Sequence, residues 1–132
     1  MTPERLIEVY SKAGLVEVAE KIVQAFKDAE NRFDNVRLYP TRKYLNLRIF
    51  INHKRIDVSV KGDPNGDHGV WTSSELYQAV KDVGNKLGFK TRIPSTDSGK
   101  IIEFNGIDGI KSAVDKLDKL IEELANVRTP SW

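Results

Sequence analysis

The spacing of apolar residues predicts four helices along the chain. Over residues 15–32 apolar side chains recur every three or four positions, which is the period of an amphipathic helix. A shorter helix is expected before it, because Thr2-Pro3-Glu4 has the residue types of a helix start and Gly14 is suited to a helix end. Two further helices are expected. One begins at the capping-box sequence 72–75 and ends near residue 87, and the other covers residues 107–127.

Between these helices the apolar period changes to two, which is typical of strands. Apolar and polar residues alternate in three segments joined by short turns, at about 36–40, 45–51 and 55–61. A second hairpin is expected from 89–93 and 100–104, and the Gly- and Asp-rich segment 62–69 is expected to be a loop. The predicted order α-α-β-β-β-α-β-β-α indicates an α+β fold, in which an antiparallel four- to five-stranded sheet has helices packed on one face.

The three consecutive strands have two faces of different chemistry. One face of each strand is wholly aliphatic, and we expect it to pack against the helices. The other face combines three aromatic residues with three arginines and a lysine. Its residues are Arg37, Tyr39, Tyr44, Asn46, Arg48, Phe50, Arg55, Asp57, Ser59 and Lys61.

The distribution of charge singles out the same part of the chain. The whole chain has a formal net charge of only +2, but residues 35–61 contain seven Lys or Arg and one acidic residue, a net charge of +6. The segments before and after are slightly acidic. Positive charge concentrated in one segment is the electrostatic footprint of a polyanionic partner.

These features predict non-catalytic binding of single-stranded nucleic acid, DNA in the first place. Bases stack on exposed aromatic rings, while Arg and Lys neutralise phosphates. The expected binding residues, which include turn residues beside the strands, are Arg37, Tyr39, Arg42, Lys43, Tyr44, Arg48, Phe50, Lys54, Arg55 and Lys61. Two other interpretations stay open. The polar face could be solvated or covered by a helix, and the chain could be a protein-interaction or structural module, for example a viral one.

The C-terminal segment 107–132 is predicted to be an amphipathic helix and a tail, appended to a nucleic-acid-binding domain over 1–106. Its apolar residues follow a heptad pattern over about two and a half heptads. Such a helix could dock on its own domain, or it could form a homodimer through Ile110, Leu117, Leu120 and Leu124. The sequence does not assign a role to either tryptophan. Trp71 is suited to a core or to stacking, and Trp132 ends the tail.

Several kinds of chemistry lack the residues they need. The chain has no cysteine, which excludes disulfides, iron–sulfur clusters and cysteine nucleophiles, and its two histidines have no metal-ligand spacing. The element order resembles that of a metal-dependent PD-(D/E)xK nuclease, but Ser59 occupies the position two before Lys61 where that motif has an acid. The main expectation is thus a protein without enzyme activity, cofactor or metal. A metal-dependent nuclease remains the alternative.

The composition also bears on the source and location of the protein. No apolar run is long enough to span a membrane, and the first residues lack the pattern of a secretion signal. With no cysteine present, we expect an intracellular, cytoplasmic protein. Richness in Lys and Glu with few Met and Gln favours a thermophilic source.

The segment 35–61 (NVRLYPTRKYLNLRIFINHKRIDVSVK) and the heptad-like segment 107–127 together resemble the ThermoDBP family of archaeal single-stranded DNA-binding proteins. The resemblance is one of architecture, size and surface chemistry over most of the chain. It implies an antiparallel sheet backed by helices, a basic and aromatic cleft, sequence-tolerant binding of single-stranded DNA and a C-terminal helix that pairs subunits. Carried over by position, the residues that would line the cleft are Arg37, Tyr39, Tyr44, Arg48, Phe50 and Arg55.

Overall fold

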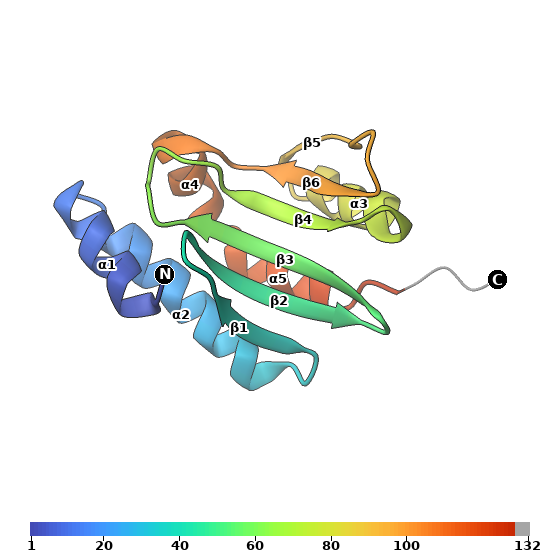
Figure 1. Ribbon diagram of the computed structural model, residues 1–132, viewed down its shortest axis with the longest axis horizontal. Helices are drawn as coiled ribbons and strands as arrows, with labels where there is room; N and C mark the ends of the chain where they lie inside the picture. The colour runs from blue at the N-terminus through green and yellow to red at the C-terminus, as the bar shows by residue number, and fades with distance from the viewer. Residues whose placement is uncertain (129–132) are drawn as a thin grey trace.

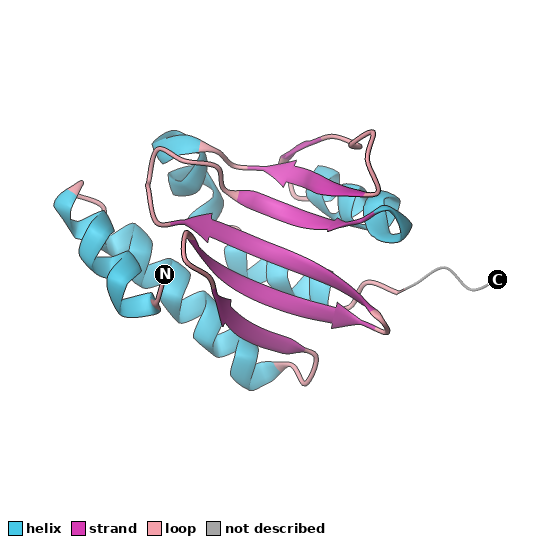
Figure 2. Cartoon of the chain, viewed as in Figure 1, coloured by secondary structure: helices cyan, strands magenta, loops and turns pink. Residues whose placement is uncertain are grey.

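Helices cover one face of an antiparallel sheet and leave the other face open (Figures 1 and 2). The computed structural model describes residues 1–128. Within them the helices are α1 (Pro3–Lys12), α2 (Val16–Arg32), α3 (Tyr77–Lys86), α4 (Gly106–Val114) and α5 (Leu117–Ala125), with a short 3-10 helix η1 (Ser74–Leu76). The strands are β1 (Val36–Pro40), β2 (Tyr44–Ile51), β3 (Lys54–Lys61), β4 (Gly69–Ser73), β5 (Lys90–Thr91) and β6 (Ser98–Glu103). The predicted α+β class is confirmed.

The first two helices begin and end where the sequence predicts. The Thr2 hydroxyl accepts a hydrogen bond from the backbone N–H of Arg5 at 3.1 Å, and Pro3 occupies the first helical turn. Gly14 follows α1 with a φ of +75°, a conformation that suits glycine and lets the chain turn back into α2. The apolar side of α2 includes Ile22 and Phe26, which are fully buried against the sheet and the other helices.

The sheet has six strands within the described residues, one more than the upper end of the prediction, in the order β1-β2-β3-β4-β6-β5 with every neighbouring pair antiparallel. The meander β1–β2–β3 and the hairpin β5–β6 are the predicted ones. The additional strand is β4, which occupies part of the segment expected to be a loop and a capping box. Val70 and Thr72 point toward the helices and are buried, whereas Trp71 points the other way.

The predicted capping box at 72–75 is wrong. Thr72 lies in β4, where its hydroxyl donates a hydrogen bond to the backbone oxygen of Arg55 at 2.8 Å. Ser73 precedes η1 without a side-chain cap, and α3 begins only at Tyr77. The reason is tertiary: the backbone of this segment pairs with both β3 and β6, and those ladder bonds outweigh a local helix start.

The predicted single helix over 107–127 is two helices, because α4 ends at Val114 and α5 begins at Leu117 after a turn at Asp115 and Lys116. The four side chains expected to pair subunits point into the domain's own core and are at most 1% exposed: Ile110, Leu117, Leu120 and Leu124. The structure thus matches the first of the two alternatives, in which this segment docks on its own domain, and these side chains are not available to a second copy. Helix α5 packs against α2, α3 and β2, so 107–128 shares one hydrophobic core with the rest of the described chain. The remainder of the predicted tail, 129–132 with Trp132, lies outside the described residues.

Both edges of the sheet carry groups that oppose further strand pairing. At β1 the backbone N–H of Leu38 donates a hydrogen bond to the Glu30 carboxylate at 2.7 Å, and Pro40 has no N–H to offer. The opposite edge, β5, is only two residues long and begins with the exposed Lys90. Among the described residues, no helix is both long and apolar enough to cross a membrane.

Candidate functional site

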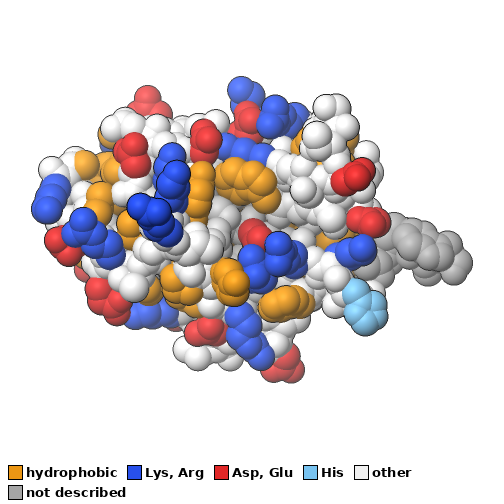
Figure 3. All heavy atoms as spheres, viewed as in Figure 1, with side chains coloured by type: hydrophobic (Ala, Val, Ile, Leu, Met, Phe, Trp, Pro, Cys, Tyr) orange, Lys and Arg blue, Asp and Glu red, His pale blue; other side chains and the backbone are white. Residues whose placement is uncertain are grey.

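The candidate site is the face of the sheet that no helix of the described chain covers (Figure 1), and Figure 3 shows this face with its side chains. The view onto this face shows basic and apolar side chains together over β1–β4. The strand register sets one row of residues across five strands: Arg37, Arg48, Asp57, Trp71 and Lys100. A neighbouring row has smaller side chains at its centre: Tyr39, Asn46, Ser59 and Gly69. We call these residues, with Tyr44, Phe50, Arg55 and Lys61, the open face.

Aromatic rings on the open face are accessible in different degrees. Tyr39 is 46% exposed and Phe50 is 44% exposed, values high for rings of this size. Tyr44 and Trp71 are half-buried and meet edge to face, with ring centroids 6.0 Å apart. Trp71, for which the sequence left two roles open, thus lies on the open face and not in the core.

Arg48 and Asp57 form an ion pair at the centre of the open face. The guanidinium Nε donates to Asp57 Oδ1 at 2.9 Å and Nη2 donates to Oδ2 at 3.4 Å. The same guanidinium lies 3.7 Å from the centroid of the Tyr39 ring. The hydrogen bond to Asp57 raises the pKa of Arg48, and the side chain is only 13% exposed. Arg48 therefore holds Tyr39 and Asp57 in place and presents less of its charge to solvent than the sequence suggests.

The freely accessible positive charge lies around this centre. Arg37, Arg42, Lys43 and Arg55 are all exposed, the first and last on strands and the middle two in the β1–β2 turn. Arg37 also donates hydrogen bonds to the backbone oxygens of Asp34 and Val36, which fixes part of its side chain. These four residues supply the positive charge that the sequence predicted for this face.

Of the two remaining predicted lysines, Lys54 lies differently from expectation and Lys61 lies on the predicted face. Lys54 pairs in register with Ile51, whose side chain points to the helices, and its ammonium forms an ion pair with Glu75 at 3.2 Å. It does not belong to the open face, because the alternation along β3 turns its side chain away. Lys61 is on the open face, in register with Tyr44, but is half-buried beside the 62–69 loop.

The two small polar side chains at the centre of the open face, Asn46 and Ser59, form its floor, and they are hydrogen-bonded to each other and to the backbone. Ser59 donates to the side-chain oxygen of Asn46, whose amide nitrogen donates to the backbone oxygen of Tyr39 at 3.1 Å. Both side chains are at most 7% exposed. Because these groups satisfy one another, the floor is a fixed surface from which the larger side chains project.

Lys100 is a residue of this face that the sequence did not single out. It is 7% exposed, its ammonium donates to the side chain of Asn105, and its Nζ lies 5.0 Å from the centroid of the Trp71 ring. Burial lowers the pKa of Lys100. Its place beside Trp71 depends on the pairing of β4 with β6, which includes a register shift at Val70 and Trp71, so no local pattern could have indicated it.

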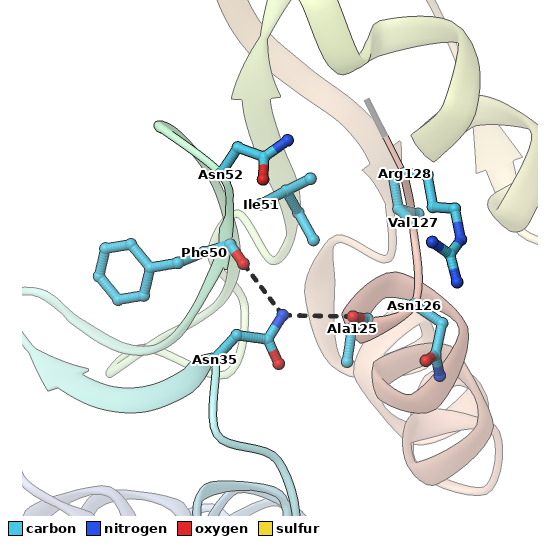
Figure 4. Close-up of a pocket in the computed structure, with 8 residues that line it drawn as sticks. All are labelled: Asn35, Phe50, Ile51, Asn52, Ala125, Asn126, Val127 and Arg128. Carbon is cyan, nitrogen blue, oxygen red and sulfur yellow. Dashed lines mark hydrogen bonds between the residues drawn. The ribbon is translucent and has the colours of Figure 1, made fainter. Parts of the chain in front are cut away.

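Two hollows adjoin the open face. One of about 240 Å³ lies between β3, β4 and the start of β6, lined by Arg55, Asp57, Trp71, Thr72, Ser73, Ser98 and Gly99. The other, of about 570 Å³, lies at the end of β2 beside the C-terminus of α5 (Figure 4). There the Asn35 amide donates to the backbone oxygens of Phe50 at 2.9 Å and Ala125 at 3.2 Å, while the Phe50 ring points away from α5. The smaller hollow belongs to the open face, and the larger one lies beyond its end.

His68, one of the two histidines, is a structural residue of the loop beside this face. Its Nδ1 accepts a hydrogen bond from the backbone N–H of Lys61 at 3.0 Å, and its Nε2 donates to the Pro64 oxygen at 3.0 Å. Within residues 1–128 no three His, Cys, Asp or Glu side chains gather in a way that could hold a metal ion.

Comparison of the chain with protein families, with curated proteins and with solved structures finds no match. The interpretation of the open face therefore rests on its own geometry.

Proposed function

We propose that this protein binds single-stranded DNA, without catalysis, through the open face of its sheet. The observation that carries the proposal is a sheet surface that no helix of residues 1–128 covers, on which the exposed rings of Tyr39 and Phe50 stand among four exposed cations, three arginines and one lysine. Base stacking on such rings contributes about 1 to 3 kcal/mol per base and tolerates any sequence, because every base has a π-face. Sequence-tolerant binding is also what the resemblance to ThermoDBP proteins implies.

The shape of the surface favours a single strand over a duplex. The side chains stand on a broad sheet, and within residues 1–128 neither a helix nor a narrow ribbon projects from this face to enter a groove. A single strand can turn its bases toward the rings and leave its phosphates toward the surrounding cations. For a protein with this activity, we propose a cytoplasmic location.

Fluorescence anisotropy of a labelled single-stranded oligonucleotide, beside its matched duplex, tests the proposal. We expect micromolar or tighter binding to the single strand, weaker binding to the duplex, and weakening of both as salt rises. Failure of the single strand to bind at about 50 mM salt would contradict the proposal, since the electrostatic part is strongest there. In that case the open face would be a candidate protein-binding surface.

A substitution of Phe50 tests the stacking part. Phe50→Ala removes a ring that is 44% exposed and should weaken single-strand binding about five- to 150-fold, the equivalent of one stacked base. Ile93→Ala is the matched control, because Ile93 is 47% exposed but follows β5 at the far edge of the sheet. Equal affinities of the two variants, with unchanged melting temperatures, would remove stacking at Phe50 from the mechanism.

A further inference from the structure

The carboxylate of Asp57 differs in charge from the other residues that β1, β2 and β3 place on the open face. It is the one acidic side chain among the ten residues that β1, β2 and β3 place there, and it lies at the centre of a surface proposed to meet phosphates. A carboxylate repels phosphate, so its position calls for a partner other than the DNA backbone. The ion pair with Arg48 explains how the Asp57 carboxylate is held at the centre of this face. It does not explain why the carboxylate stays partly exposed to solvent.

That access is through the smaller hollow. Asp57 lines the space of about 240 Å³ together with the Trp71 ring and Arg55, and its side chain remains 18% exposed. An ionised carboxylate has about four acceptor sites on its two oxygens, and Arg48 takes one on each. The Arg55 Nε lies 3.9 Å from Oδ2, too far for a good hydrogen bond. The carboxylate thus keeps acceptor capacity next to an aromatic ring and an exposed cation.

We infer that this hollow takes one base of the bound strand and prefers a base with an exocyclic amino group, cytosine over thymine among the pyrimidines. The inference rests on the proposed function and adds a base preference to it. Trp71 would supply the stacking surface, Asp57 would accept from the amino group, and Arg55 would meet the adjoining phosphate. Cytosine presents an amino donor at the position where thymine presents a carbonyl oxygen, and that oxygen would face the carboxylate with like polarity.

The test compares the affinity of the protein for oligo-dC and oligo-dT of equal length by fluorescence anisotropy near neutral pH. The wild-type protein should bind oligo-dC at least about fivefold more tightly, the lower end of what one specific base contact contributes. Asp57→Asn keeps the size of the side chain and an oxygen for Arg48, but it turns an amide donor toward the hollow. The preference for oligo-dC should then disappear or reverse.

Glu103→Gln is the matched control. It removes the same charge from the same side of the sheet, in register with Gly69 and beside Lys90, but outside the hollow. It should change the affinity for both oligonucleotides by the same factor and keep their ratio.

The outcomes separate the inference from the proposed function. If neither oligonucleotide binds, the proposed function fails. If the wild-type protein binds both equally, the function stands and the base preference is overturned, without need of any variant. A preference that persists unchanged in a folded Asp57→Asn protein would also overturn the role given to Asp57.

Discussion

The turn between β1 and β2 offers a quantitative test of the electrostatic part of binding. Arg42 and Lys43 are both exposed there, at one end of the open face, and the bond that the Lys43 backbone oxygen accepts from the Gly62 N–H does not involve either side chain. The double substitution Arg42→Gln, Lys43→Gln removes two positive charges without touching the core. Two of the four exposed cations around the open face are then gone, and Arg37 and Arg55 remain.

The expected magnitude follows from counterion release. If each of the four exposed cations meets one phosphate, the logarithm of the binding constant should fall by about 2.8 per tenfold rise in salt, at about 0.7 per contact. Between about 50 and 200 mM salt the wild-type affinity should fall about 50-fold, and that of the double variant, with half the slope, about sevenfold. The ratio of the two affinities should therefore shrink about sevenfold over this range.

The assay is an anisotropy titration of one single-stranded oligonucleotide at four or five salt concentrations. Lys27→Gln, Lys111→Gln is the control pair, because both lysines are exposed on α2 and α4 and the net charge changes by the same amount. This control should keep the wild-type slope. Equal slopes for the wild-type protein and the turn variant would refute the reasoning, since they would mean that neither side chain meets a phosphate.

Two further predictions concern stability. Burial, reinforced by the charge of Lys100, lowers the pKa of His68, so the unfolded chain takes up a proton at a higher pH than the folded one. The free energy of unfolding should thus decrease as pH falls below about 6.5, and in urea titrations it should depend less on pH for His68→Gln than for the wild-type protein. The same pH dependence in both proteins would contradict this. Tyr10 is fully buried and its hydroxyl donates to the Lys61 oxygen at 2.8 Å. Tyr10→Phe should lower the urea midpoint by the equivalent of about 1 to 2 kcal/mol at unchanged slope, and an unchanged midpoint would show that this bond adds nothing.

The elements set by short-range patterns could be predicted from the sequence. Burial on one side imposes a period of 3.6 on a helix and of two on a strand, and α2, β2 and β3 follow these periods closely. The Arg48–Asp57 pair was not predicted, although it depends on local information, because the tight turn at Asn52 and His53 places Arg48 opposite Asp57.

The remaining features depend on contacts between distant segments. Strand β4 is short and rich in turn-forming neighbours, and it becomes a strand by pairing with β6, about 30 residues later in the chain. The meeting of Trp71 with Lys100 depends on that same pairing. The heptad pattern of the C-terminal segment left two alternatives open for a related reason: over two heptads, a helix that docks on its own domain and one that pairs subunits bury the same positions.

The hydrogen bond from Leu38 to Glu30 at the β1 edge also affects how the protein behaves at high concentration. A second molecule that tried to extend the sheet at β1 would find a carboxylate already bound at Leu38 and no donor at Pro40. At the other edge it would find a strand of two residues with an exposed lysine. Open sheet edges are the usual starting points of aggregation, and this sheet is protected at both. The sheet can therefore keep one broad face free of helices without joining the sheet of a second molecule, because neither edge strand offers a suitable row of backbone groups for pairing.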